Sequence, residues 1–189
     1  MILSDRDIKK AMKEGHVDVK PLVPNSIQPA SVDLHLDSKF LFFKNGKHTF
    51  IDVKEPLDDL MEMVDVKKDG YIVIHPNEFV LGNTLETVTV DKTIAGRLEG
   101  KSSLARLGLL VHVTGGYLDP GNSTTLTLEF HNVNNLPIKL YPGMKIAQMS
   151  FMTMSSECER GYGDKKLGSK YYGKNKPVAS QIYKDFIKK

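Results

Sequence analysis

The stretch that decides the fold is Thr124-Thr125-Leu126-Thr127-Leu128-Glu129-Phe130. Apolar and polar side chains alternate along it with a period of two, which is typical of a β-strand with one buried face. The alternation puts Leu126, Leu128 and Phe130 on the buried face. Glu129 is therefore predicted to project from the other, non-core face of the strand.

Similar runs occur on both sides of this one. The further predicted strands are residues 71–74, 79–81, 87–90, 109–113, 138–141 and 145–152. Turn sequences separate them at Pro76-Asn77, Pro120-Gly121, Asn134-Asn135 and Pro142-Gly143. Because short strands follow one another without a helix after each, the sequence predicts an all-β sandwich, jelly roll or barrel rather than an α/β sheet.

The N-terminal part of the chain begins with a helix signal. Ser4 with Asp7 three residues later resembles a capping box, and Gly15 supplies a stop, so a short N-terminal helix is predicted. Residues 32–43 then take up a strand pattern, and the Asn45-Gly46 pair after them predicts a hairpin turn.

Two segments lack a strand pattern. Residues 55–70 are predicted to form a short helix or loop inserted between strands. Residues 155–189 are rich in glycine, lysine and tyrosine and are predicted to form a mobile basic arm. Tyr162 and Lys170 within it fit a disordered tail as well as an arm that closes over a bound polyanion. The whole chain, residues 1–189, has the length of a single domain.

Charge and cysteine content indicate which partners and which cellular compartment suit the protein. The net charge is only +3, from 26 basic and 23 acidic residues, which does not suit a nucleic-acid partner. The single cysteine, Cys158, cannot form an internal disulfide, which fits a reducing compartment, so the cytoplasm is expected. No apolar run approaches the ~20 residues that cross a bilayer, and no membrane partner is expected.

Residues 100–129 gather groups that suit a phosphorylated ligand. Lys101 and Arg106 can pair with phosphate oxygens, and Ser102 and Ser103 between them can donate to phosphate or hold a water molecule. The carboxylates of the same region repel phosphate, so they must serve another part of a ligand, such as a sugar hydroxyl or a water.

Each of these groups also has a structural interpretation. Lys101 and Arg106 could equally be surface cations. Asp119, just before Pro120-Gly121, has the features of a turn residue. For Glu129, a solvated surface carboxylate and a site residue are about equally favoured by the residues alone.

Two other chemistries fit the sequence poorly. A P-loop around Gly100-Lys101-Ser102 would require a glycine at position 95, where the chain has Ala95. A zinc deaminase requires two cysteines in P-C-x-x-C, and the histidines show no metal-ligand spacing. We therefore expect no zinc and no metal held by the protein, and Mg²⁺ only as an ion carried by a substrate triphosphate.

Longer motifs resemble those of the deoxycytidine triphosphate (dCTP) deaminase family. They are GRLEGKSSLARLGL at residues 96–109, GYLDPG at 116–121, TLE at 127–129 and PGMKIAQ at 142–148. The resemblance begins at residues 1–8, includes QPASVDL at 28–34, and ends at Ser169-Lys170-Tyr171. It covers nearly the whole chain, and the combination is far more specific than any one motif.

The resemblance implies a fold and an assembly. The fold is that of the trimeric dUTPases, a distorted jelly-roll β barrel, here with a short N-terminal helix, small helical insertions and a C-terminal arm. The assembly is a homotrimer with its sites at subunit interfaces.

The resemblance also implies which residues form the site. The substrate-binding residues are Lys101, Ser102, Ser103, Leu104, Ala105, Arg106, Asp119, Thr127, Leu128, Glu129, Gln148, Tyr162, Lys170 and Lys174. Among them Asp119 holds the deoxyribose, while Tyr162 and Lys170 of the arm bind the triphosphate. Lys174 departs from the family, which commonly has glutamine at this position.

Three of these residues are implied to be catalytic. Glu129 matches the catalytic glutamate and would carry protons between the attacking water, N3 and the departing amino group. Ser102 would help to hold the water, and Arg106 would orient the carboxylate and balance its charge.

The implied activity is hydrolysis of dCTP to dUTP and ammonia. Some family members continue to dUMP and pyrophosphate. Gly115-Gly116-Tyr117 resembles these bifunctional members, whereas His112-Val113-Thr114 resembles the deaminase-only ones. The sequence therefore favours dUMP as the product only slightly. Inhibition by dTTP is implied as well.

Two alternative functions stay open at this point. The first is a dUTPase without deaminase activity, against which Glu129 and the intact Ser102-Ser103 pair count. The second is a non-catalytic nucleotide sensor on the same fold, against which the complete set of catalytic residue types counts.

Overall fold

A computed structural model describes residues 1–44, 46, 49–67 and 70–187. The strands are β1 (Val17–Lys20), β2 (Ile27–Gln28), β3 (Ser31–His35), β4 (Lys39–Phe43), β5 (Met61–Asp65), β6 (Ile72–Ile74), β7 (Phe79–Val90), β8 (Ile94–Gly100), β9 (Leu109–Leu110), β10 (Tyr117–Leu118), β11 (Ser123–Asn132), β12 (Ile138–Leu140) and β13 (Lys145–Thr153). The helices are α1 (Asp5–Glu14) and α2 (Ser102–Ala105), with short 3₁₀ turns η1 (Asp58–Leu60) and η2 (Ile182–Asp185). This is the predicted strand-rich architecture.

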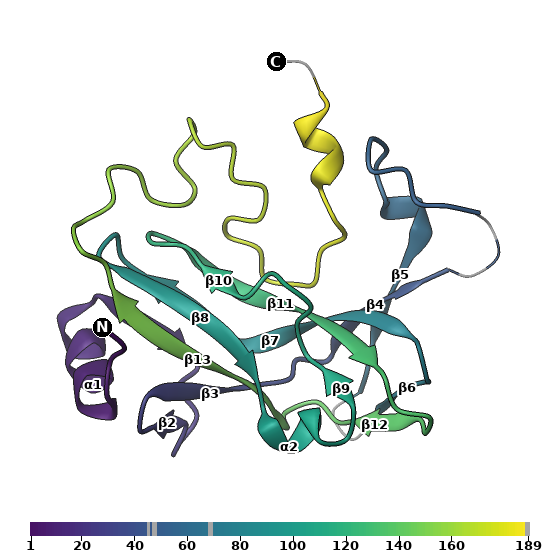
Figure 1. Cartoon of the computed structure of the whole chain (residues 1–189), viewed down its shortest axis with the longest axis horizontal. Helices are drawn as coiled ribbons and strands as arrows, with labels where there is room; N and C mark the ends of the chain where they lie inside the picture. Colours follow the sequence, from purple (N-terminus) through teal and green to yellow (C-terminus); the bar gives the residue numbers. More distant parts are fainter. Residues whose placement is uncertain (45, 47–48, 68–69, 188–189) are drawn as a thin grey trace.

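Two antiparallel sheets form the body of the molecule (Figure 1). One has the order β5-β4-β7-β11-β9, with β1 also paired to β7, and the other has the order β10-β8-β13-β3-β2. β12 and β6 form a separate two-stranded ladder. Fully buried side chains from both sheets meet in one core, with Phe40 and Phe130 from the first and Phe151 from the second. Their burial is the main driving force for closing the two sheets on each other.

The N-terminal helix is confirmed together with its ends. The Ser4 side chain accepts a hydrogen bond from the Asp7 N–H, and Gly15 ends the helix in the left-handed conformation that favours glycine. Ile8 and Ala11 are the buried residues of the helix, and they belong to the same core as the strands.

One prediction for the region after β4 is wrong, and another falls partly outside the described residues. β4 pairs with β5, which begins only at Met61, and the predicted hairpin turn at Asn45-Gly46 includes Asn45, which lies outside the described residues. Residues 55–70 contain not only the predicted helical turn, η1, but also the strand β5. This strand has no alternation of buried apolar and exposed polar residues that would mark it in the sequence, because Met63 and Val64 are exposed along with Glu62 and Asp65.

β11 contains the stretch 124–130, and from Leu128 onward its buried and less buried positions alternate as predicted. Leu128 and Phe130 are fully buried, while Glu129 between them is half-buried. A register shift against β7 between Thr125 and Thr127 interrupts the alternation, and Thr125 is buried with its hydroxyl bonded to Asn83. Such a bulge bends the strand and redirects its side chains.

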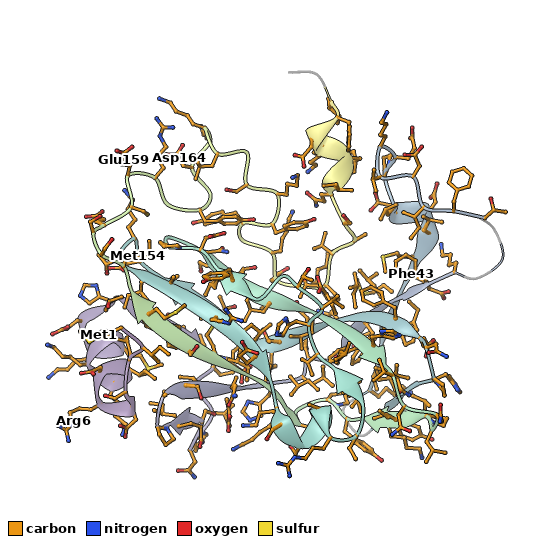
Figure 2. All side chains as sticks on the ribbon, in the orientation of Figure 1. Met1, Arg6, Phe43, Met154, Glu159 and Asp164 are labelled. Atoms are coloured by element: carbon orange, nitrogen blue, oxygen red, sulfur yellow. The ribbon has the colours of Figure 1, made fainter. Side chains whose placement is uncertain are left out.

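Residues 155–187 form a tail that crosses one end of the sheets and has no strand of its own (Figure 1). Glu159 and Asp164 lie on its outer edge in Figure 2. The Lys174 carbonyl accepts hydrogen bonds from the Thr125 N–H and the Thr124 hydroxyl, at 3.1 and 2.8 Å. Ala179 is buried in a second apolar cluster beside β4 and β5. The tail therefore lies against the barrel here; the predicted mobility stays a prediction.

Candidate active site

A cavity of about 400 Å³ lies between the N-terminal part of β11, the turn after β10 and the tail. Five of the residues predicted to form the site line it: Asp119, Thr127, Glu129, Tyr162 and Lys174. These residues come from three separate segments of the chain, and the fold brings them together around one space. A cavity of this size is typical of small-molecule sites.

Glu129 has one carboxylate oxygen held and the other facing open space. Its Oε2 accepts a hydrogen bond from the Val113 N–H at 2.8 Å, and its backbone N–H donates to the Val111 carbonyl. A methyl group built on Gly115 would stand 3.6 Å from Oε1, so this glycine leaves room beside the carboxylate. In the part of the chain that the structure describes, no protein donor reaches Oε1. The arrangement fixes the carboxylate and leaves one oxygen for a ligand or a water.

The turn that carries Asp119 supports the tail. Tyr162 donates its backbone N–H to the Pro120 carbonyl at 2.8 Å. Gly121 has a φ of +82°, and a methyl group built on it would lie 2.8 Å from the Gly161 Cα. Glycine is therefore required at position 121 both for the backbone conformation and for the approach of the tail. The exposed Asp119 and Tyr162 both line this cavity.

Lys170 lines a second cavity, of about 450 Å³, which Asp119 and Tyr162 also border. Its ammonium donates to the Asp185 carboxylate at 2.7 Å, and this hydrogen bond raises the pKa of Lys170. The cation is thus held at the mouth of the site by an acidic partner from the same tail.

The predicted motif residues 101–106 lie at a different place. α2 carries Ser102 and Ser103, both exposed, and Arg106 ends the helix with an exposed side chain. Neither cavity is lined by any of these residues. In Figure 1, α2 lies at the lower edge of the molecule and the tail at the upper edge.

The remaining predicted residues also line neither cavity. Gln148 lies on β13, where it pairs with Glu99 of β8, and it does not line either cavity. Leu104 and Leu128 are buried in the core, so either could meet a ligand only through its backbone. Ala105 is exposed on α2. Lys101 donates to the Asp33 carboxylate at 2.6 Å.

The structure adds an apolar wall that the sequence analysis did not assign to the site. The apolar residues of this wall are Phe43, Leu57, Met61, Phe79, Leu81 and Val178. Phe43 is labelled in Figure 2, beside β5. Leu57 and Met61 lie in the segment 55–70, to which no chemistry was assigned, and the β4–β5 pairing places Met61 opposite Phe43.

Two further findings concern the described residues only. No group of three or more histidine, cysteine, aspartate or glutamate side chains is placed to hold a metal ion. None of the helices in this part of the chain has the length and apolarity needed to cross a membrane.

Comparisons with known proteins agree with the motifs. A family model described as dCTP deaminase-like matches residues 2–154. A relative named "dCTP deaminase, dUMP-forming" from Corynebacterium kroppenstedtii is 50% identical over 186 residues, which are 98% of this chain and 100% of the relative. A relative of the same name from Corynebacterium glutamicum (strain R) is 50% identical over 189 residues and covers both chains fully.

A solved structure supports the fold. The 2'-deoxycytidine 5'-triphosphate deaminase from Agrobacterium tumefaciens superposes with a TM-score of 0.62 at 22% identity, over 79% of this chain and 48% of that chain. This chain thus spans about half the length of that protein, and the likeness concerns the fold alone. The predicted fold, all-β and dUTPase-like with a short N-terminal helix, is confirmed. By the match over residues 2–154 and by half-identity to relatives of equal length, the chain belongs to the dCTP deaminase-like family.

Proposed function

We propose that this protein hydrolyses dCTP to ammonia and dUTP and continues to dUMP and pyrophosphate. The observation that carries the proposal is the Glu129 carboxylate, which faces the cavity with one oxygen held by the Val113 N–H and the other open. The relatives named dUMP-forming, at half-identity over the whole chain, support the same two-step outcome.

In the proposed first step, Glu129 moves protons. It takes a proton from a water molecule as the oxygen bonds to C4 of the cytosine, and passes it to N3. A second proton from the attacking oxygen goes to the amino group, which leaves as ammonia when the C4–N bond breaks. The hydrogen bond from the Val113 N–H stabilises the ionised carboxylate and fixes its direction during these transfers.

In the proposed second step, a water attacks the α-phosphate of dUTP, and pyrophosphate leaves with the Mg²⁺ that the triphosphate carries. Tyr162 and Lys170 from the tail would hold the triphosphate, and Asp119 would hold the sugar. Gly115 and Tyr117 of the Gly115-Gly116-Tyr117 turn line the cavity, and Gly115 leaves space beside Glu129 Oε1. This space supports dUMP as the product, which the sequence of the turn slightly favours.

We infer that the complete site includes a second copy of the chain within a homotrimer. Ser102 and Arg106 are exposed, catalytic by resemblance, and line neither cavity of the single chain. The edge strand β9 next to α2 exposes Leu110, and the nearby Leu107 and Leu136 are 52% and 70% exposed. Exposed apolar side chains at a sheet edge fit a subunit contact. Inhibition by dTTP and a cytoplasmic location stay predictions.

One experiment separates this function from its alternatives. The protein is incubated with Mg²⁺ and either dCTP or dUTP, and ammonia, dUTP, dUMP and pyrophosphate are resolved. We expect equal amounts of ammonia, dUMP and pyrophosphate from dCTP. Pyrophosphate from dUTP without ammonia from dCTP would instead identify a dUTPase, and dCTP binding without any product would identify a sensor.

A further inference from the structure

A buried carboxylate near α2 holds two lysines at once. Asp33 is 1% exposed. Its Oδ1 accepts a hydrogen bond from the Lys101 ammonium at 2.6 Å, and its Oδ2 lies 2.9 Å from the Lys145 ammonium. Lys101 is a predicted site residue, whereas Asp33 and Lys145 are not among the residues predicted to form the site.

The three residues come from neighbouring strands that end beside α2. Asp33 lies on β3, Lys145 begins β13, and Lys101 follows β8 and stands directly before Ser102. Gln148 pairs directly with Asp33 across the β13–β3 ladder. Directly paired residues of antiparallel strands share a sheet face, so Asp33 and Gln148 point to the same side.

The cluster carries one more positive than negative charge. Burial alone would raise the pKa of Asp33, but the hydrogen bonds from Lys101 and Lys145 outweigh it, and the pKa is lowered. Asp33 is thus ionised at neutral pH, and the trio has a net charge of +1. Within the described ranges, neither lysine contacts a second carboxylate.

Both ammonium groups keep donors for a ligand. A lysine ammonium has three N–H donors, and Asp33 uses one from each. The Lys101 and Lys145 side chains are 23% and 49% exposed. Two cations that share one carboxylate lie within a few ångströms of each other, which suits adjacent phosphate groups of one polyphosphate.

We propose that Lys145 is a second cationic contact for the β- and γ-phosphates of the substrate, and that Asp33 is the positioning residue that holds it beside Lys101. This inference rests on the proposed function, since it adds a residue to the same site. The proposal explains why the buried carboxylate of Asp33 lies next to cations that attract an anion. Without Asp33, the adjacent ammonium groups of Lys101 and Lys145 would repel each other.

The test compares Lys145→Gln with a matched control, Lys9→Gln. Lys9 also pairs with an aspartate, but it lies on α1 with a 62% exposed side chain, away from both cavities. Dissociation constants for dCTP and dCMP are measured by calorimetry at several salt concentrations, with kcat and KM for dCTP in parallel. Thermal unfolding of each variant records any loss of stability.

We expect Lys145→Gln to weaken dCTP binding and raise KM about tenfold, with kcat nearly unchanged and dCMP binding unchanged. The salt dependence of dCTP binding should become shallower, and Lys145→Arg should restore most of the affinity. Lys9→Gln should change none of these quantities. A dCTP dissociation constant equal to that of Lys9→Gln would overturn the inference and leave an ion cluster that only joins β3, β8 and β13.

The binding measurement does not depend on turnover. If the unmodified protein released no ammonia from dCTP, the proposed deamination would fail, while the comparison of dCTP with dCMP would still decide the role of Lys145. Asp33→Asn should weaken dCTP binding in the same direction. Because Asp33 is buried, Asp33→Asn can also lose stability, so the result for Lys145→Gln decides whether the inference holds.

Discussion

At the scale of single residues, one backbone hydrogen bond decides how Glu129 presents its carboxylate. The alternation in β11 predicts the side of the strand to which Glu129 projects. It cannot predict that the Val113 N–H holds Oε2 or that Gly115 leaves space at Oε1, because those residues lie on a separate loop. The role of Glu129 could thus be inferred from the motif, and its orientation only from the fold.

A second residue-scale contact gives a pH dependence. His16 follows α1, and its Nδ1 lies 2.6 Å from the Asp91 carboxylate. This hydrogen bond is the main cause of a pKa raised above the ordinary 6.5 of histidine. A raised pKa in the folded state stabilises the protein fully below the unfolded value, and this stabilisation is lost as the pH rises through the folded value.

We therefore expect the free energy of unfolding to contain a contribution from His16 at pH 6 that decreases above pH 6.5. Urea unfolding of the unmodified protein and of His16→Gln at a series of pH values from 6 to 9 measures it. The difference in stability between the two proteins should shrink as the pH rises. A difference that is constant over this range would show that His16 does not titrate against Asp91.

At the scale of elements, the tail and the turn at residues 119–121 together form one wall of the site. The sequence marks Asp119, Pro120 and Gly121 as a turn, which is correct, but not that the turn supports the tail through the Pro120 carbonyl. Contacts between segments 40 residues apart leave no local pattern. The same limit explains why β5 was not predicted: its pairing with β4 joins Phe43 to Met61 across a long connection, which leaves no local pattern.

Gly121→Ala tests whether the docked tail contributes to the site. Gly121 and Gly143 both have a φ of +82°, so an alanine at either position costs about 1 kcal/mol in backbone strain. Only at Gly121 would the new methyl group collide with the tail, whereas at Gly143 nothing lies within 4 Å. Gly143→Ala is therefore the matched control.

We expect Gly121→Ala to raise KM for dCTP several-fold and to speed proteolytic cleavage within residues 155–187, while Gly143→Ala changes stability alone. Limited proteolysis with and without dCTP, together with steady-state kinetics, measures both effects. Equal behaviour of the two variants would mean that the tail does not need the Gly121–Gly161 contact.

At the scale of the whole molecule, the predicted site residues fall into two groups, one around the cavity and one at α2. Asp119, Glu129 and Tyr162 surround the cavity, while Ser102 and Arg106 lie at α2 (Figure 1). Sequence motifs list both groups together, since a motif does not record which copy of the chain supplies a residue. A site shared between copies would reconcile the motif with the fold.

Subunit complementation tests such a shared site. Glu129→Gln and Arg106→Ala should each be nearly inactive alone. In randomly mixed trimers with a head-to-tail interface, about a quarter of the sites would combine an intact Glu129 from one copy with an intact Arg106 from the next. Mixed assemblies, obtained by co-expression with two different tags, should therefore recover roughly that share of deaminase activity. Activity no higher than that of either parent would place the whole site within one chain.

The central claim is that Glu129 carries the protons of a dCTP deamination. The most direct measurement is the rate of ammonia release from dCTP by the unmodified protein and by Glu129→Gln, with dCTP affinity determined for both. We predict ammonia release by the unmodified protein, a loss of about 10²–10⁴-fold in the variant, and nearly equal affinity. Ammonia release by Glu129→Gln at a near-normal rate, or none from the unmodified protein, would contradict the claim.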